Sequence, residues 1–422
     1  PLASCGPAPA TPAAVSSVEL AADTIAPSRT PSPSPALTPI PSPSPTSHAS
    51  PVPAATATAS PTSLPTFTPA PALPPVLTPA AAKPLPLSLG WRLDANGHLT
   101  EGRIMQRDGK TLFLTSSLGR IVYAMREDGT IAWHLRTDGP VYTMTALDPD
   151  HVAVGDDAGH VTLIATSGQR LWQTDLGSRV TSLLGGWQDG ILAGGWDERL
   201  SLLDSGGNLR WQVKLDGPLS QIATLPGLAV AATLEGQVKA YDPSGAELWH
   251  FAAGSPVIGL ETVGEGNQAS LLLSLQDGRL LALDRRGQPH WQLSIGSGSP
   301  VIHIANLAGE ASPAILAGIG GKEPQMILLS AAGQVLWRVA VPAPVGALTT
   351  LDLDGDGTLE ILAGLASGQI QAYDQQGRLH GSVHAGLPVW GIEAGSNGSA
   401  LVLADVAAWR LEPSAGPAGR PW

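Results

Sequence analysis

The sequence has few cysteines, no basic cluster and no long apolar run, and each shortage excludes a class of protein. Its 422 residues include one cysteine, Cys5, which excludes a disulfide framework and a cysteine-rich zinc site. The chain carries 23 Lys and Arg residues against 35 Asp and Glu residues. We therefore expect no nucleic-acid partner, because phosphate contacts need cations grouped on one face. No apolar run approaches the ~18 residues that a membrane-spanning helix requires.

Common catalytic motifs are also missing. The chain contains no Gly-x-Ser-x-Gly nucleophile elbow and no phosphate-binding Gly-Lys-Ser loop. Its 10 histidines are scattered, without the i, i+2 or i, i+4 grouping of a zinc site. These gaps favour a protein that is not an enzyme.

Residues 1–88 differ in composition from the rest of the chain. They hold 23 of the 39 prolines but only one of the 49 glycines. A Pro/Ser/Thr/Ala tract with almost no aromatic residues cannot bury enough apolar surface to offset the entropy of ordering it. We expect residues 1–88 to be a disordered linker that favours extended polyproline II, and residues 413–422 to be a short disordered tail.

The first residues resemble a lipoprotein processing site. Leu2-Ala3-Ser4-Cys5 is similar to the bacterial lipobox, whose cysteine is lipidated. The position of Cys5 ahead of a long linker supports this hypothesis, and the alternative is an incidental thiol. The resemblance implies an extracytoplasmic bacterial lipoprotein that reaches the membrane only through its lipid anchor.

One unit recurs about every 40 residues from residue 89 onward. Its clearest mark is a glycine followed four positions later by a tryptophan, as in Gly129 and Trp133. The tryptophans that we assign to this docking position are Trp91, Trp133, Trp172, Trp211, Trp249, Trp291 and Trp337. The copy that starts at Gly377 has Gly381 in place of tryptophan.

Each unit supplies four short apolar strands separated by Gly, Asp, Asn and Ser turns, and none has a sustained helical period. Four strands in a period of about 40 predict a β-propeller over residues 89–412. The last unit, 388–412, offers three strands, and the segment around Trp91 can supply the fourth. We therefore predict an all-β, eight-bladed propeller of four-stranded blades, closed by the N-terminal strand. Seven blades is the alternative.

The unit Ala-Tyr-Asp-x-x-Gly-x-x-x-Trp, seen at Ala240–Trp249, resembles the tryptophan-docking repeat of the pyrroloquinoline-quinone propeller superfamily. That superfamily includes quinoprotein dehydrogenases and lipid-anchored assembly proteins of the outer-membrane-scaffold type. Quinoproteins of this kind carry an adjacent cysteine pair and long cofactor loops. This chain has a single cysteine, outside the repeats, and short turns, so we expect no bound quinone.

A second resemblance lies in residues 351–364, which look like the calcium loop of integrin-type (FG-GAP-like) propeller repeats. Hard carboxylate oxygens at alternate positions suit Ca²⁺. The candidate ligands are Asp352, Asp354, Asp356, the Thr358 carbonyl and Glu360. The alternative is an acidic turn without an ion.

Three further residues are candidates for binding at the mouth of the central channel. Tyr142, His303 and Trp390 lie near the starts of predicted innermost strands. Such residues more often only pack the channel.

These features favour a tethered, non-enzymatic binding or assembly platform, monomeric, with a protein or another cell-envelope component as partner. One alternative is a quinoprotein-like oxidoreductase with its cofactor in the channel. Another is an integrin-like adhesion or carbohydrate-binding propeller shaped by calcium. Because a propeller fold does not determine function, the partner cannot be named from the sequence.

Overall fold

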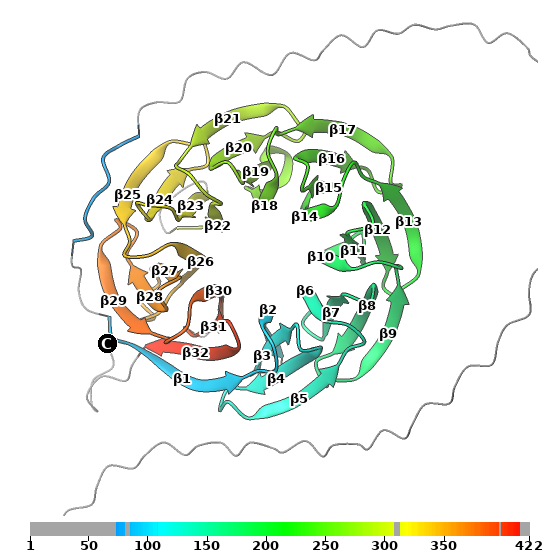
Figure 1. Ribbon diagram of the computed structural model, residues 1–422, viewed down its shortest axis with the longest axis horizontal. Coiled ribbons are helices and arrows are strands. Elements are labelled where there is room, and N and C mark those ends of the chain that lie inside the picture. The colour runs from blue at the N-terminus through cyan, green and yellow to red at the C-terminus, as the bar shows by residue number, and fades with distance from the viewer. Residues whose placement is uncertain (1–72, 81–84, 108, 308–312, 396–397, 414–422) are drawn as a thin grey trace, which may run out of the picture. The chain divides into compact units, whose positions relative to one another are not determined.

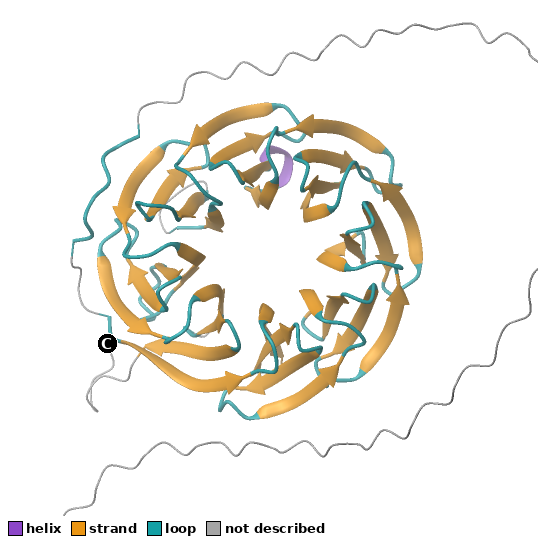
Figure 2. Ribbon diagram, in the orientation of Figure 1, coloured by secondary structure: helices purple, strands orange, loops and turns teal. Residues whose placement is uncertain are grey.

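A computed structural model describes residues 73–80, 85–107, 109–307, 313–395 and 398–413 of the chain. Within these residues, eight four-stranded antiparallel sheets surround a central opening (Figure 1). The predicted eight-bladed propeller is confirmed. The helical content of the same residues is one short 3-10 turn, Gly266–Gln268, and none of their helices is long and apolar enough to cross a membrane (Figure 2).

The blades are numbered in chain order, and each is given from its innermost to its outermost strand. Blades 1 to 4 consist of these strands: β2 (Leu99–Arg107), β3 (Lys110–Ser117), β4 (Ile121–Arg126) and β5 (Ile131–Arg136); β6 (Val141–Asp148), β7 (His151–Asp156), β8 (His160–Ala165) and β9 (Arg170–Asp175); β10 (Val180–Trp187), β11 (Gly190–Gly195), β12 (Arg199–Asp204) and β13 (Leu209–Lys214); β14 (Leu219–Leu225), β15 (Leu228–Thr233), β16 (Gln237–Tyr241) and β17 (Glu247–Ala252).

Blades 5 to 8 follow the same pattern. They consist of these strands: β18 (Val257–Val263), β19 (Ser270–Leu275), β20 (Arg279–Leu283) and β21 (Pro289–Ser294); β22 (Val301–Ala305), β23 (Ala314–Ile319), β24 (Gln325–Ser330) and β25 (Val335–Ala340); β26 (Val345–Leu351), β27 (Glu360–Leu365), β28 (Gln369–Tyr373) and β29 (Leu379–His384); β30 (Val389–Ala394), β31 (Ala400–Ala404), β32 (Ala407–Pro413) and β1 (Leu87–Asp94).

Blade 8 closes the ring with strands from both ends of the propeller. β1 pairs antiparallel with β32, with Leu93 opposite Ala408 (Figure 1). The predicted closure by the N-terminal strand is therefore confirmed. Closure removes two free sheet edges that an open array of blades would expose to pairing with other chains.

The hydrophobic core is divided among the contacts between blades. Eight clusters of buried residues were found among the described residues, one at each junction between adjacent blades. The second strands, such as β11 and β15, are buried along their whole length because neighbouring blades cover both faces. This explains why their sequences are continuous apolar runs rather than alternating ones.

The docking tryptophans connect each blade to the next. The ring of Trp291 lies against Gly333 in the turn of the following blade, and its Nε1 donates to the Ala331 carbonyl at 3.0 Å. Gly333 has φ of 78°, and an added Cβ would lie 2.5 Å from the indole. The same hydrogen bond, to the carbonyl two residues before the turn glycine, is made by Trp133, Trp172, Trp211, Trp249 and Trp337.

Trp91 packs in the same way but lacks that bond. Its ring lies over Gly129, yet the Glu127 carbonyl at the acceptor position receives Arg410 Nη1 at 3.2 Å. Among the described residues, Nε1 of Trp91 is buried without a hydrogen-bond partner.

Contacts with the propeller begin before residue 89, the start that the sequence predicts. β1 begins at Leu87, and residues 73–80 and Leu85 also lie against the outer strands of blades 6 and 7. The linker boundary at residue 88 is therefore too far along the chain, because polyproline composition does not prevent an extended segment from pairing. The remaining linker, including Cys5, and the tail from 414 lie outside the described residues.

Candidate functional sites

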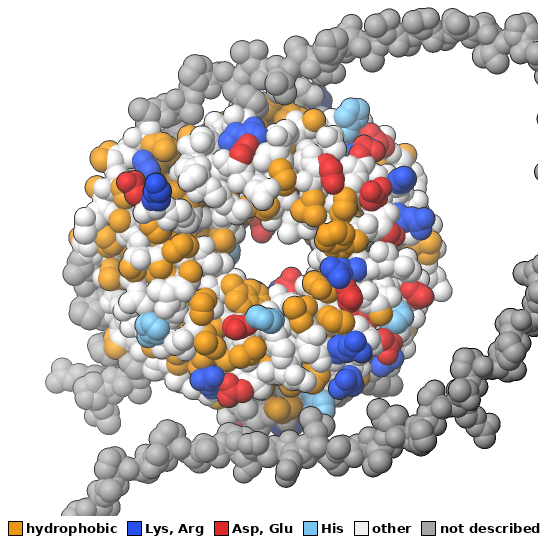
Figure 3. All heavy atoms as spheres, in the orientation of Figure 1, with side chains coloured by type: hydrophobic (Ala, Val, Ile, Leu, Met, Phe, Trp, Pro, Cys, Tyr) orange, Lys and Arg blue, Asp and Glu red, His pale blue; other side chains and the backbone are white. Residues whose placement is uncertain are grey.

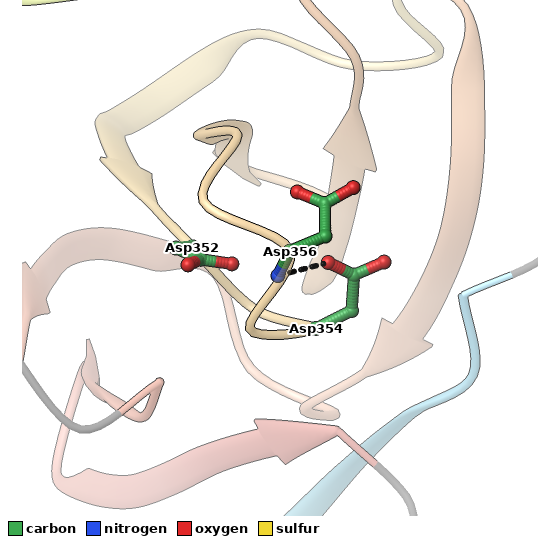
Figure 4. Close-up of side chains that lie close together, drawn as sticks. All are labelled: Asp352, Asp354 and Asp356. Atoms are coloured by element: carbon green, nitrogen blue, oxygen red, sulfur yellow. Dashed lines mark hydrogen bonds between the residues drawn. The ribbon is translucent and has the colours of Figure 1, made fainter. Parts of the chain in front are cut away.

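The acidic turn of blade 7 joins β26 to β27. One carboxylate oxygen from each of Asp352, Asp354 and Asp356 lies within 4.8 Å of the other two (Figure 4). The two oxygens of Asp352 accept the N–H groups of Gly355 at 2.8 Å and Gly357 at 3.0 Å. The turn therefore converges three of the five predicted ligands, and their hard oxygens suit a divalent cation such as Ca²⁺.

Glu360 is not one of the three carboxylates that converge in this turn. It is the first residue of β27, is 5% exposed, and accepts the Leu353 N–H at 2.8 Å. Burial, and then repulsion from the three aspartates, raises the pKa of Glu360 to about 7. Thr358 lies on the exposed side of the turn and donates its N–H to Asp356 at 2.7 Å. A cavity of about 690 Å³ adjoins the turn on the side of blade 8, where Gly395 and Pro413 line it.

The three predicted channel-mouth residues lie on innermost strands of three different blades. Tyr142 is in β6, His303 in β22 and Trp390 in β30. His303 Nε2 lies 3.4 Å from the Thr350 hydroxyl of the next blade, and burial lowers its pKa to about 4. Trp390 packs against the apolar cluster between blades 8 and 1. Each residue thus makes its contacts in a separate part of the ring.

The innermost strands also carry acidic groups that the sequence analysis missed. Glu101 of β2 and Glu393 of β30 are half-buried, and burial is the main cause that raises the pKa of each carboxyl group. Glu261 of β18 is solvent-exposed. Arg103 pairs with Glu101 at 3.0 Å. The signal in the sequence was a carboxylate within the first strand of a repeat, where most copies have an uncharged residue.

A second group, of which the sequence analysis named only Tyr142, lies on the face formed by the turns between second and third strands. The Arg179 guanidinium carbon lies 4.7 Å from the ring centroid of Tyr142 and 5.5 Å from that of Trp196. Arg179 also donates its Nε–H to Asp157. These residues come from two neighbouring blades, and Trp196 is 53% exposed. We call Tyr142, Asp157, Arg179 and Trp196 the arginine stack.

The arginine stack borders further apolar surface. Leu234, in the corresponding turn of blade 4, is 39% exposed. In Figure 3, hydrophobic side chains gather beside the central opening over β10 and β14, next to a basic side chain. A cation held between two rings, beside exposed apolar groups, is the composition of a protein-binding surface.

Comparisons with known proteins agree with this architecture. The family described as outer membrane protein assembly factor BamB matches the chain over residues 157–318. The crystal structure of the computationally designed Ika8 protein is 16% identical with a TM-score of 0.63, over 75% of this chain and 97% of that one. BamB from Moraxella catarrhalis is 16% identical with a TM-score of 0.60, over 79% of this chain and 99% of that one. No significant match was found among curated proteins.

The family match confirms the predicted resemblance to quinone-type propeller repeats. The structural matches have low sequence identity, so they show the fold alone. Calcium binding and lipidation of Cys5 stay predictions.

Proposed function

We propose that this chain is a non-enzymatic protein-binding platform, tethered outside the cytoplasm through Cys5, whose partner binds at the arginine stack. The observation that carries the proposal is Trp196, a large ring that is 53% exposed and fixed beside a cation. Tryptophan, tyrosine and arginine are the residues that most often dominate binding energy at protein interfaces. The similarity to BamB repeats supports an assembly role.

The geometry of the stack favours binding because it is already ordered. Arg179 is held by two rings and by the Asp157 carboxylate. Ordering a long side chain on binding costs about 0.5–1.5 kcal/mol, and this arrangement reduces that cost. The apolar surface at Leu234 would extend the contact onto blade 4.

We also propose that the acidic turn of blade 7 binds Ca²⁺ as a structural brace rather than as part of the partner site. The three aspartates that converge there repel one another without a cation. Their turn joins strands 1 and 2 of its blade, whereas Asp157 and Trp196 of the arginine stack lie in turns between strands 2 and 3. Calcium would therefore stabilise the fold without touching the partner.

Site-specific photo-cross-linking in the host organism tests the partner proposal. A photoreactive amino acid at Leu234, which borders the arginine stack, should capture a discrete partner. Adding Trp196→Ala or Arg179→Ala should reduce the yield about tenfold or more, the loss expected for a binding hot spot. The matched control places the same amino acid at Leu248, which is 53% exposed but lies on the outermost strand β17. Identical products from positions 234 and 248, or no effect of Trp196→Ala and Arg179→Ala, would contradict the proposal.

A further inference from the structure

The missing tryptophan at position 381 has a topological cause. A docking tryptophan needs the turn between the third and fourth strands of the next blade, which provides the glycine and the acceptor carbonyl. In blade 8 the third strand, β32, and the fourth, β1, come from opposite ends of the propeller. No turn joins them, so a tryptophan on β29 would have nothing of this kind to dock on.

The chain that enters β1 occupies this place instead. A Cβ on Gly381 would lie 2.2 Å from the Leu85 carbonyl oxygen, so only glycine fits there. Leu85 donates its N–H to the His380 carbonyl at 2.9 Å. Its side chain is 7% exposed and joins the cluster between blades 7 and 8 that includes Val389 and Trp409. Leu85 thus covers the junction that tryptophan covers elsewhere.

The residues upstream continue along the free edges of the outer strands. Leu77 donates its N–H to the Arg338 carbonyl at 2.8 Å and accepts the Ala340 N–H at 3.0 Å, in a parallel bridge to β25. The Ala80 carbonyl accepts the Leu379 N–H of β29 at 2.8 Å. Arg338 also donates to the Pro74 carbonyl at 3.0 Å.

We propose that the outer edges of β25 and β29 are a strand-addition surface for an extended, proline-containing apolar segment, and that residues 73–80 together with Leu85 of this chain are its occupant. Backbone hydrogen bonds supply affinity in strand addition, and side chains at intervals supply specificity. The anchors are Leu73, which packs on the cluster between blades 5 and 6, and Leu85.

The prolines of the segment suit this role. Pro74, Pro75 and Pro79 flank Leu77 and have no N–H to donate, so a long ladder cannot form. Backbone pairing is limited to Leu77, Ala80 and Leu85 among the described residues, and each proline presents no N–H with which another chain could pair. The segment therefore binds the edges and caps them at once.

The segment also fixes where the N-terminal tract leaves the propeller. Among the described residues, Leu73 lies at the junction of blades 5 and 6, Leu77 pairs with blade 6, and Ala80 and Leu85 pair with blade 7 before β1 completes blade 8. A pull on the tract would act on the bonds at Leu77 and Ala80 before it reached the closing strand. Residues 73–80 and Leu85 of the predicted linker thus belong to the propeller.

Hydrogen exchange on the full-length chain tests the assignment, because the Ala340 and Leu379 amides are bonded to this segment. Leu77→Pro removes one donor and should speed exchange at both amides about tenfold or more. Val76→Pro is the matched control. It introduces the same residue one position away and leaves the Leu77 N–H and carbonyl in place, so protection should persist.

A synthetic peptide of residues 71–86 provides the second readout. Added in excess to the Leu77→Pro protein, it should restore protection at Ala340 and Leu379, as a strand-addition surface requires. Unchanged exchange in Leu77→Pro would overturn the proposal, as would equal loss of protection in Val76→Pro. Failure of the peptide to restore protection would overturn the claim that the edges bind such a segment.

Discussion

At the scale of single residues, the hydrogen bond from a docking tryptophan to the next blade is missing only at the two junctions of blade 8, where the two ends of the propeller meet. Six tryptophans donate to the same carbonyl of the next turn. The exceptions are Trp91, whose acceptor is taken by Arg410, and Gly381, whose place is filled by Leu85. Both exceptions lie at junctions of blade 8, the blade built from two ends of the chain. The repeat is thus adjusted locally to ring closure.

This difference makes Trp291 and Trp91 a matched pair. Trp291→Phe keeps a ring at the junction but removes the bond to Ala331 and leaves a carbonyl with one partner fewer. We expect it to lower the free energy of unfolding by about 1 kcal/mol more than Trp91→Phe does, since Trp91 has no such bond to lose. Denaturant unfolding of both variants measures the difference. Equal losses would mean that packing alone holds the blades together.

Calcium binding gives a second prediction at this scale. Millimolar Ca²⁺ should raise the melting temperature, because an ion that binds only the folded state stabilises it by mass action, with a dissociation constant on the order of 10⁻⁴–10⁻³ M. Asp354→Ala removes one of the three converging carboxylates and should abolish the shift. Glu265→Ala, in the corresponding turn of blade 5, should retain it. A wild-type melting curve unaffected by both Ca²⁺ and chelator would favour an acidic turn without an ion.

At the scale of elements, the sequence predicted what repeats. The eight blades could be predicted because two sequence patterns repeat. Each second strand is buried on both faces and is therefore a continuous apolar run, and each outer strand carries a docking position. Even the closing strand was predictable, since Trp91 carries the docking signal without its blade. Local patterns are informative when every copy is subject to the same packing.

What the sequence did not predict comes from contacts between unlike segments. The arginine stack joins turns from different blades, so no local pattern marks it. Residues 73–80 and Leu85 have linker composition, and their pairing depends on free edges that exist only once blades 6 and 7 have formed. The acidic turn of blade 7 was predicted in part. Its three aspartates were predicted to converge and do, whereas Glu360 is bonded to Leu353.

At the scale of the whole molecule, three regions divide the work. The arginine stack is the proposed binding surface, residues 73–80 and Leu85 pair with the outer edges, and the sequence upstream of them contains Cys5, the proposed lipidation site. Because the fastening uses the outermost strands, it leaves the face with the arginine stack available to a partner. The proposed partner-binding surface and the segment that leads to the proposed anchor thus use different elements of the ring.

The anchor can be tested separately from the partner site. Expressed behind a secretion signal, the wild-type chain should fractionate with membranes, because two or more acyl chains on Cys5 are enough for stable attachment. Cys5→Ser removes the only thiol in the chain and should move the protein into the soluble fraction. Ser4→Ala alters the neighbouring residue, keeps the thiol and should remain with membranes. Folding should be the same in all three, since the change lies far upstream of the residues that form the propeller strands. Membrane partitioning that survives Cys5→Ser would show that something other than a lipid on this cysteine holds the protein there.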